Sequence, residues 1–147
     1  RESQLRSSTD AASFQAQREV LIYTASSDME RSQALQAAGA SVICMAGPDQ
    51  RVDLRSMLTD LAKREVNELH VEAGQGLNAA LLQASLVDEL LVYLAPCVLG
   101  QGKQMFPFGP LQSLEDKVQL NFDSVSMIGP DLRIVARIQG REALLTT

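Results

Sequence analysis

The sequence predicts an α/β protein in which short strands alternate with single helices. Short apolar runs recur along the first two thirds of the chain, and the early ones are followed by stretches of good helix formers with a start signal. The last third instead carries two longer apolar runs joined by a turn. Because single helices between strands form right-handed crossovers, we expect a mostly parallel central sheet, helices on both faces and a C-terminal antiparallel hairpin.

Two strand and helix pairs are predicted in the first half of the chain. Val20–Tyr23 is a β-branched and aromatic run, and Ser27 with Glu30 forms a capping box before a helix that ends at Gly39. Ala40–Met45 predicts the next strand. The helix after it is expected to be capped by Asp53 and to present one apolar face, made of Leu54, Met57, Leu58, Leu61 and Ala62.

The second half begins with a third predicted strand, Glu68–Glu72, in which Leu69 and Val71 alternate with charged residues or histidine. A glycine turn then leads into a helix, and Leu90–Ala95 predicts the fourth strand. Val118–Met127 and Leu132–Ile138 are expected to pair as the antiparallel hairpin. The predicted third helix has an apolar face made of Leu77, Ala80, Leu81 and Ala84.

Composition narrows the class of protein. A chain of 147 residues with 46% hydrophobic content predicts one domain, residues 1–147. The net charge of -5, with basic residues scattered along the chain, argues against nucleic acid as a partner. No apolar run approaches the roughly 20 residues that span a bilayer, so we expect a soluble, cytoplasmic protein without membrane association. Cys44 and Cys97 lack metal-ligand spacing and are expected to be reduced and buried, and no metal site is predicted.

The candidate chemistry is concentrated where the third predicted strand meets the next helix. Gly74 and Gly76 follow Glu72 at this junction, and the N–H groups that open the helix would point at a common spot. Such a turn favours a phosphate or pyrophosphate group. The alternative is that the two glycines only satisfy the geometry of the turn.

The longer segment around this junction carries the most specific signal. Val66–Gly74, Leu86–Leu90, Ala95–Pro96 and Leu99–Gly100 closely resemble the reductase domain of the bifunctional riboflavin-biosynthesis deaminase-reductases and the stand-alone reductases of that pathway. Gly129-Pro130-Asp131 supports the resemblance near the C-terminus. At the N-terminus, Glu2-Ser3-Gln4-Leu5-Arg6 is similar to the family's Asp-Ser-Gln-x-Arg stretch, with Glu in place of Asp.

This resemblance implies a dihydrofolate-reductase-like, three-layer α/β fold and an NADPH-dependent oxidoreductase that forms a homodimer. Its substrate would be a phosphoribosyl-pyrimidine, 5-amino-6-(5-phosphoribosylamino)uracil, reduced to the ribitylamino form. Glu72 falls on the family's substrate contact, and no catalytic residue is assigned. The implied cofactor contacts are Ser3, Gly74, Gln75, Gly76, Leu77, Asn78, Ala79 and Ala80. Family members often have Pro and Thr where this chain has Gln75 and Gly76, so a hydroxyl donor is lost at position 76.

Family members normally carry further strands upstream of the residues matched here, so we expect that residues 1–147 lack the N-terminal strands of the reductase domain and show no measurable reductase activity when assayed alone. The deaminase half is not expected either, because neither its His-x-Glu nor its Pro-Cys-x-x-Cys motif is present. Two other functions stay open: a pterin-type reductase of the same fold, and a non-catalytic nucleotide-binding or assembly domain. The sole histidine, His70, is either a proton donor or a hydrogen-bonded structural residue.

Overall fold

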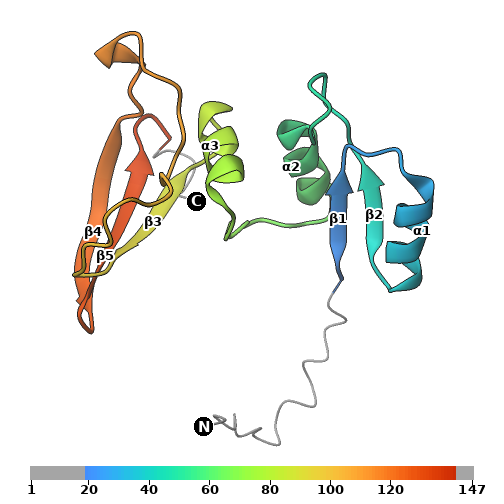
Figure 1. The fold of residues 1–147 in the computed structure, drawn as a ribbon, viewed down its shortest axis with the longest axis horizontal. Coiled ribbons are helices and arrows are strands. Elements are labelled where there is room, and N and C mark those ends of the chain that lie inside the picture. The colour runs from blue at the N-terminus through green and yellow to red at the C-terminus, as the bar shows by residue number, and fades with distance from the viewer. Residues whose placement is uncertain (1–18, 142–147) are drawn as a thin grey trace, which may run out of the picture. The chain divides into compact units, whose positions relative to one another are not determined.

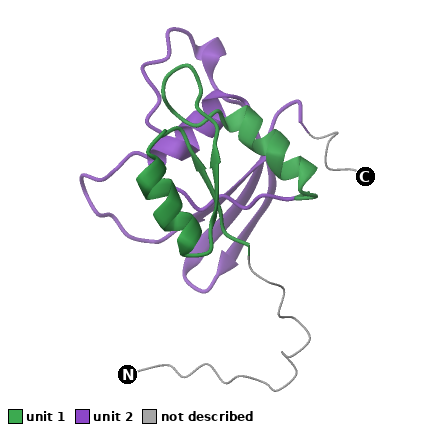
Figure 2. Cartoon of the chain, turned by 90° about the vertical axis from the view of Figure 1, so that its right-hand side faces the viewer, with its two compact units in different colours: residues 1–67 green, residues 68–147 purple. Residues whose placement is uncertain are grey.

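The computed structural model describes residues 19–141 (Figure 1). The chain divides into two compact units, residues 1–67 and residues 68–147 (Figure 2). The predicted cofactor contact Ser3 lies outside the described residues. The expectation of a single domain over residues 1–147 stays a prediction.

The first unit is built around two parallel strands. Strand β1, Leu21–Thr24, pairs along its whole length with β2, Ser41–Cys44. Helix α1, Met29–Ala37, connects the two strands, and α2, Leu54–Lys63, follows β2. The two helices lie on opposite sides of the strand pair (Figure 1). These elements confirm the two strand and helix pairs expected from the sequence, with strand ends that shift by about a residue, as is usual for such boundaries.

Both helices of the first unit begin at an aspartate. The Asp53 carboxylate accepts a hydrogen bond from the Ser56 N–H at 3.0 Å, which confirms the predicted cap of α2. The cap of α1 is Asp28, which accepts from the Arg31 N–H at 2.9 Å, so the prediction of Ser27 as the cap was wrong by one residue. A carboxylate is a stronger acceptor than a hydroxyl, which favours Asp28 over its neighbour. Gly39 has a φ of 94°, the left-handed conformation expected after the helix.

The second unit holds a three-stranded antiparallel sheet. Its strands are β3, Glu89–Leu94, β4, Leu120–Ile128, and β5, Asp131–Ile138, in the order β3-β5-β4. Helix α3, Gln75–Gln83, precedes β3, and a short 3₁₀ helix, Leu114–Asp116, precedes β4. The hairpin of β4 and β5 confirms the prediction for the C-terminal part. The most buried side chains of the described residues all belong to this unit: Ala79, Leu81, Leu82, Val135 and Ala136.

The strand register gives this sheet one apolar face. Residues directly opposite each other share a face, and Val92, Ile134 and Val125 form one such row. A β-bulge between Phe122 and Ser124 adds one residue to β4. The apolar face consists of Leu90, Val92, Leu94, Leu120, Phe122, Val125, Met127, Leu132, Ile134, Ala136 and Ile138.

Polar contacts hold the end of the sheet to the loop before β3. The Arg141 guanidinium donates to the Asp88 carboxylate at 2.8 Å and also to the Ser85 carbonyl. The Ile138 N–H donates to the Asp88 carbonyl at 3.0 Å. Because Ser85 follows α3 and Asp88 precedes β3, these contacts tie the C-terminal end of the helix to the last strand.

Three sequence predictions are corrected by the structure. Glu68–Glu72 forms no strand with any described residue, and Leu69 and Val71 are 45% and 39% exposed. A strand exists only when its N–H and C=O groups find a neighbouring strand, so alternation alone was not sufficient. The four early strands therefore do not form one parallel sheet among residues 19–141, because β3 pairs antiparallel with β5. Cys44 and Cys97 are free, as expected, but exposed rather than buried.

The apolar face expected for the third helix is also only partly correct. Leu81 is buried, but Leu77 is 41% exposed and Ala84 is exposed. The side chains that α3 buries are Ala79, Leu81 and Leu82, so the helix is turned relative to the expected stripe. The apolar face predicted for α2 agrees better, because Leu54, Met57, Leu58 and Leu61 are all half-buried.

Candidate functional site

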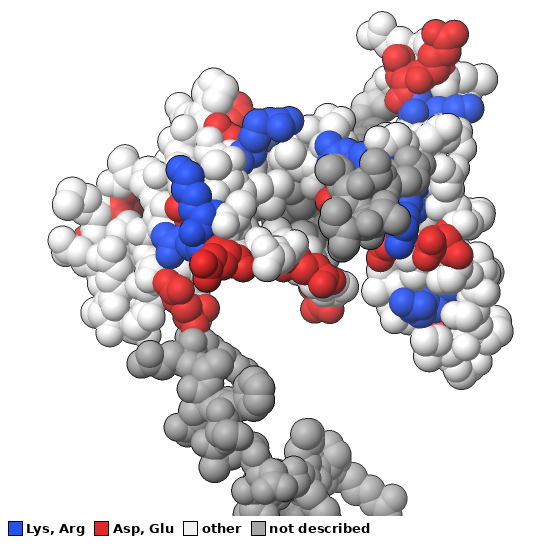
Figure 3. All heavy atoms as spheres, turned by 180° about the vertical axis from the view of Figure 1, so that it is seen from behind, with Lys and Arg blue, Asp and Glu red and all other residues white. Residues whose placement is uncertain are grey.

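Charged side chains of both signs are interspersed on the face of the molecule drawn in Figure 3. On the face drawn in Figure 3, Lys and Arg side chains lie beside Asp and Glu rather than in one continuous basic area. Among residues 19–141, no group of three or more His, Cys, Asp or Glu side chains could hold a metal ion. No helix in this part of the chain is long and apolar enough to cross a membrane.

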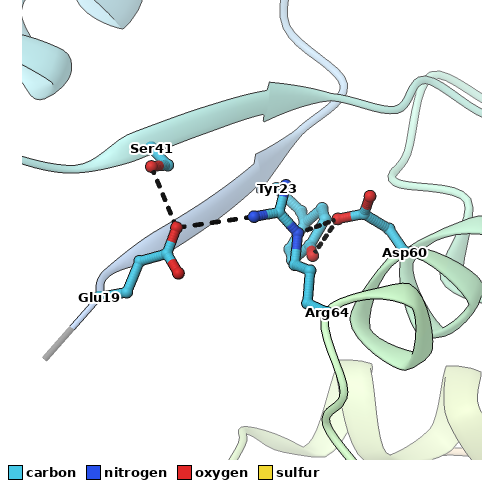
Figure 4. Close-up of polar contacts among 5 residues, drawn as sticks. All are labelled: Glu19, Tyr23, Ser41, Asp60 and Arg64. Carbon is cyan, nitrogen blue, oxygen red and sulfur yellow. Dashed lines mark hydrogen bonds and ion pairs between the residues drawn. The ribbon is translucent and has the colours of Figure 1, made fainter. Parts of the chain in front are cut away.

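The most distinctive polar cluster of the first unit joins β1 to α2. The Tyr23 hydroxyl donates to Asp60 Oδ2 at 2.7 Å, and Arg64 Nε donates to the same oxygen at 2.7 Å (Figure 4). Arg64 also lies 3.6 Å from Glu19 Oε1, to which the Ser41 hydroxyl donates at 3.4 Å. These side chains bond to one another across β1, β2 and α2, so the cluster stabilises the packing of α2 on the strand pair.

The electrostatics of this cluster follow from the same contacts. Burial, followed by the hydrogen bond to Asp60, raises the pKa of Tyr23 above its usual value. The hydrogen bond from Tyr23, followed by that from Arg64, lowers the pKa of Asp60. Asp60 is therefore held as a carboxylate, which is the form that accepts both hydrogen bonds.

The predicted cofactor segment forms the start of α3. Gly74 is the residue before the first helical turn, with φ of −76° and ψ of 165°, and its carbonyl accepts from the Asn78 N–H at 3.2 Å. No side chain caps this helix, and its first turn contains no acidic residue. The N–H groups of residues 74–77 donate to no other group among the described residues. A helix start in this condition attracts anions, because the unpaired N–H groups and the helix dipole both favour negative charge.

Space beside this backbone is open. A Cβ atom placed on Gly74 or on Gly76 would have no neighbouring heavy atom within 4 Å, and both glycines are exposed. A phosphate group could therefore approach the backbone closely, which is the fit that a dinucleotide requires at a helix start. Of the other predicted contacts, Leu77 is exposed, Gln75, Asn78 and Ala80 are half-buried, and Ala79 is buried against the core at 4% exposure.

Glu72 lies two residues before the glycine turn and is open to solvent. Its side chain is 86% exposed, and Oε1 is 3.5 Å from His70 Nε2. The pair joins two exposed side chains on the same short segment, so the carboxylate can still accept hydrogen bonds from a ligand. Glu72, Gly74 and Gly76 thus lie within five consecutive residues, but the strand end that the sequence predicted before the turn is absent from the described residues.

One contact at this junction was not found by sequence analysis. The Asn78 side-chain amide donates to the Ala73 carbonyl at 3.2 Å and is partly buried. The sequence prediction treated Asn78 only as a cofactor contact. The available signal was an asparagine in the first helical turn after a glycine cap, since such a short amide can bond to nearby backbone.

Comparison with known proteins gives a consistent result. A model of the family described as RibD C-terminal domain matches residues 2–134. The riboflavin biosynthesis protein RibD of Actinobacillus pleuropneumoniae is 29% identical over 135 residues, which cover 89% of this chain and 36% of that protein. The 5-amino-6-(5-phosphoribosylamino)uracil reductase of Buchnera aphidicola subsp. Acyrthosiphon pisum is 32% identical over 88 residues, covering 59% of this chain and 42% of the relative.

Among solved structures, Acinetobacter baumannii RibD aligns with a TM-score of 0.64 at 26% identity, over 73% of this chain and 29% of that chain. This similarity confirms the expected dihydrofolate-reductase-like α/β fold. The chain spans well under half the length of each of these relatives.

Proposed function

The chain belongs to the RibD C-terminal domain family, and on that premise we propose that it is a reductase domain of riboflavin biosynthesis, one domain over residues 1–147. Its reaction would be the NADPH-dependent reduction of 5-amino-6-(5-phosphoribosylamino)uracil to the ribitylamino form. The name of the Buchnera relative supports this choice of substrate. We also propose that the protein is a cytoplasmic homodimer, as the sequence resemblance implies.

The observation that carries the proposal is the uncapped start of α3 beside an exposed carboxylate. The N–H groups of residues 74–77 would receive the phosphates of the dinucleotide, and the glycines at 74 and 76 would let them approach. When bound, NADPH would supply the hydride that reduces the ribosyl C1 in its open-chain, imine-like form. The protein's part is to hold the cofactor and the sugar in contact.

Glu72 would position the sugar. Its exposed carboxylate can accept two or more hydrogen bonds, which suits the hydroxyl groups of an open-chain ribose. Only Ala73 separates Glu72 from Gly74, so this acceptor lies close along the chain to the residues proposed to bind phosphate. A single short segment would then contribute to both substrate and cofactor binding.

The direct test is reduction of the proposed pyrimidine by the purified full-length protein. NADPH oxidation is followed by absorbance and the ribitylamino product by mass spectrometry. A panel of pterin substrates is assayed in parallel. We expect product from the pyrimidine and none from the pterins. Turnover of a pterin instead would favour the related reductase, and NADPH binding without any reduction would favour a non-catalytic nucleotide-binding domain.

The role of Glu72 is tested by Glu72→Gln, with Glu68→Gln as a matched control in the same exposed segment. A neutral amide fills the same space but is a weaker acceptor, so turnover should fall about tenfold or more while NADPH affinity changes little. The control should retain wild-type turnover. Equal losses of turnover and NADPH affinity in Glu72→Gln would contradict the substrate role.

A further inference from the structure

Asn78 bonds to both carbonyl groups of the turn that opens α3, one through its side chain and one through its backbone. The Asn78 amide Nδ2 donates to the Ala73 carbonyl at 3.2 Å, and the Asn78 backbone N–H donates to the Gly74 carbonyl at 3.2 Å. The side chain is half-buried, and no side chain caps the N–H groups of this helix. The orientation of the Ala73–Gly74 peptide group therefore depends on the Asn78 side chain, whereas the next peptide group is held by an ordinary helical hydrogen bond.

Because the peptide bond is planar, a hydrogen bond that fixes a carbonyl group also fixes the direction of the N–H group in the same peptide. A trans peptide is planar, with its C=O and the following N–H pointing in opposite directions, and none of the described peptide bonds is cis. Because the Ala73 carbonyl points at Asn78, the Gly74 N–H must point away from it. In the same way, the Gly74 carbonyl points along the helix, so the Gln75 N–H points out of the helix start.

Glycine makes this restraint necessary. Gly74 has no side chain to restrict its backbone, and a Cβ there would meet no atom within 4 Å, so neither sterics nor packing fixes the turn. Gly76 follows two residues later with the same open surroundings. A flexible turn would lose entropy on ordering around a phosphate, whereas a turn already held by hydrogen bonds would not.

We propose that Asn78 is a positioning residue that aims the Gly74 N–H group at the cofactor phosphates through its hydrogen bond to Ala73. This inference rests on the proposed function and deepens it. The Asn78 side chain would not touch the phosphate itself; it would fix the backbone whose N–H group binds the phosphate.

The test compares ligands with and without phosphate groups in Asn78→Leu, which keeps the approximate size of the side chain but has no donor. Calorimetry should show NADPH affinity about tenfold weaker, the effect of one lost net hydrogen bond. Affinity for reduced nicotinamide riboside, which lacks phosphates, should stay within about twofold. Asn78→Gln, which keeps an amide on a longer stem, should recover most of the loss.

Gln83→Leu is the matched control, because it removes an exposed amide from the other end of the same helix. It should leave NADPH affinity unchanged, and circular dichroism should show that every variant is folded. As a readout independent of activity, inorganic pyrophosphate should shift the amide NMR signals of Gly74 and Gln75 in the wild type, and the shift of the Gly74 signal should be smaller in Asn78→Leu.

The outcomes separate this inference from the proposed function. Wild-type NADPH affinity in Asn78→Leu, with normal reduction of the pyrimidine, would overturn the role of Asn78 and leave the function standing. Equal losses for NADPH and the riboside would make Asn78 a general structural residue and would also overturn the inference. Failure of the wild-type protein to bind NADPH or pyrophosphate would overturn both.

Discussion

The helices of the two units begin in different ways. In the first unit, α1 and α2 start at Asp28 and Asp53, whose carboxylates accept the N–H groups of the first turn. In the second unit, α3 starts at Gly74, and no side chain accepts its first N–H groups. The aspartate caps use the donors of the helix for local stability, whereas the glycine start keeps them available for an anion.

The same contrast extends to the side chains around these helices. In the first unit, the side chains of Tyr23 and Arg64 both donate to the same carboxylate oxygen of Asp60. In the second unit, Glu72 is 86% exposed beside the glycine turn. A polar group with a complete set of partners stabilises the fold, and one without them is available to a ligand. The family match over residues 2–134 includes residues of both units, and under the proposed function the contrast would separate scaffold from site.

The largest effect is expected when the start of α3 is made to resemble those of α1 and α2. Gly74→Asp places a carboxylate where it can accept the first N–H groups, and its charge repels phosphate. NADPH affinity should fall about a hundredfold or more in titration calorimetry, equivalent to about 2.7 kcal/mol. The helix itself should be no less stable, because an aspartate is a better cap than a glycine.

Two companion variants separate charge from bulk. Gly74→Val adds volume without charge, in a region of backbone conformation that valine readily adopts, and should also weaken NADPH binding strongly while the protein stays folded. Gly109→Asp places the same charge at a glycine whose surroundings are equally open and should have no effect. Unchanged NADPH affinity in a folded Gly74→Val protein would count against the whole cofactor assignment.

A smaller effect, on stability alone, is expected in the first unit. Tyr23→Phe removes the hydroxyl that donates to Asp60 at 2.7 Å and should lower the free energy of unfolding by about 1 kcal/mol. Denaturant unfolding measures this loss, and NADPH affinity should not change. If Tyr23→Phe weakened NADPH binding as much as stability, the division between scaffold and site would be wrong.

The same cluster predicts a loss of stability in acid. The Tyr23 and Arg64 hydrogen bonds lower the pKa of Asp60 in the folded protein below its ordinary value of 3.8. The stability contributed by Asp60 is therefore present above pH 3.8 and is lost as the pH falls through the lowered folded value. Thermal unfolding between neutral and acidic pH should show this decline, and Asp60→Asn should reduce it. If the loss of thermal stability at acidic pH were the same in Asp60→Asn as in the wild type, other carboxylates would be responsible for it.

The smallest effect is expected from the reverse change in α2. Asp53→Gly gives this helix the same kind of start as α3, and the N-terminal hydrogen bond to Ser56 is lost. The thermal midpoint should fall slightly, and pyrophosphate should still not perturb the amide signals of residues 54–56 in NMR. New pyrophosphate binding at α2 would show that an uncapped helix start is sufficient to bind anions in this protein. Anion binding at α3 would then be no evidence for a cofactor site.

Much of this architecture was predictable because local signals carry it. Asp53 was identified as a cap from its position before a periodic apolar pattern, and the β4 and β5 hairpin from two apolar runs joined by a turn. The Ser27 prediction failed because two adjacent residues can both cap a helix, and only the folded turn selects Asp28. The prediction of a strand over Glu68–Glu72 was wrong because alternation of apolar and polar residues does not show whether a partner strand is present.

The candidate site also has features that could be predicted from the sequence and features that could not. Glu72, Gly74 and Gly76 lie next to one another in the sequence, so their proximity needed no tertiary information. The direction of the Asn78 amide could not be predicted, because it depends on a side-chain rotamer set by the turn. The Tyr23 and Asp60 contact was also beyond sequence analysis, since it joins a strand to a helix across 37 positions.

The bulge in β4 determines where this strand can change in length. Asp123 is the extra residue between Phe122, opposite Ala136, and Ser124, opposite Val135. Deleting Asp123 would restore regular alternation and leave every other side chain of β4 on its present face. Deleting Ser126 would instead move the residues on one side of it to the opposite face. Position 123 is therefore the one point along β4 at which a single-residue deletion keeps the apolar face intact, and the length of this strand can vary there without a change in the core.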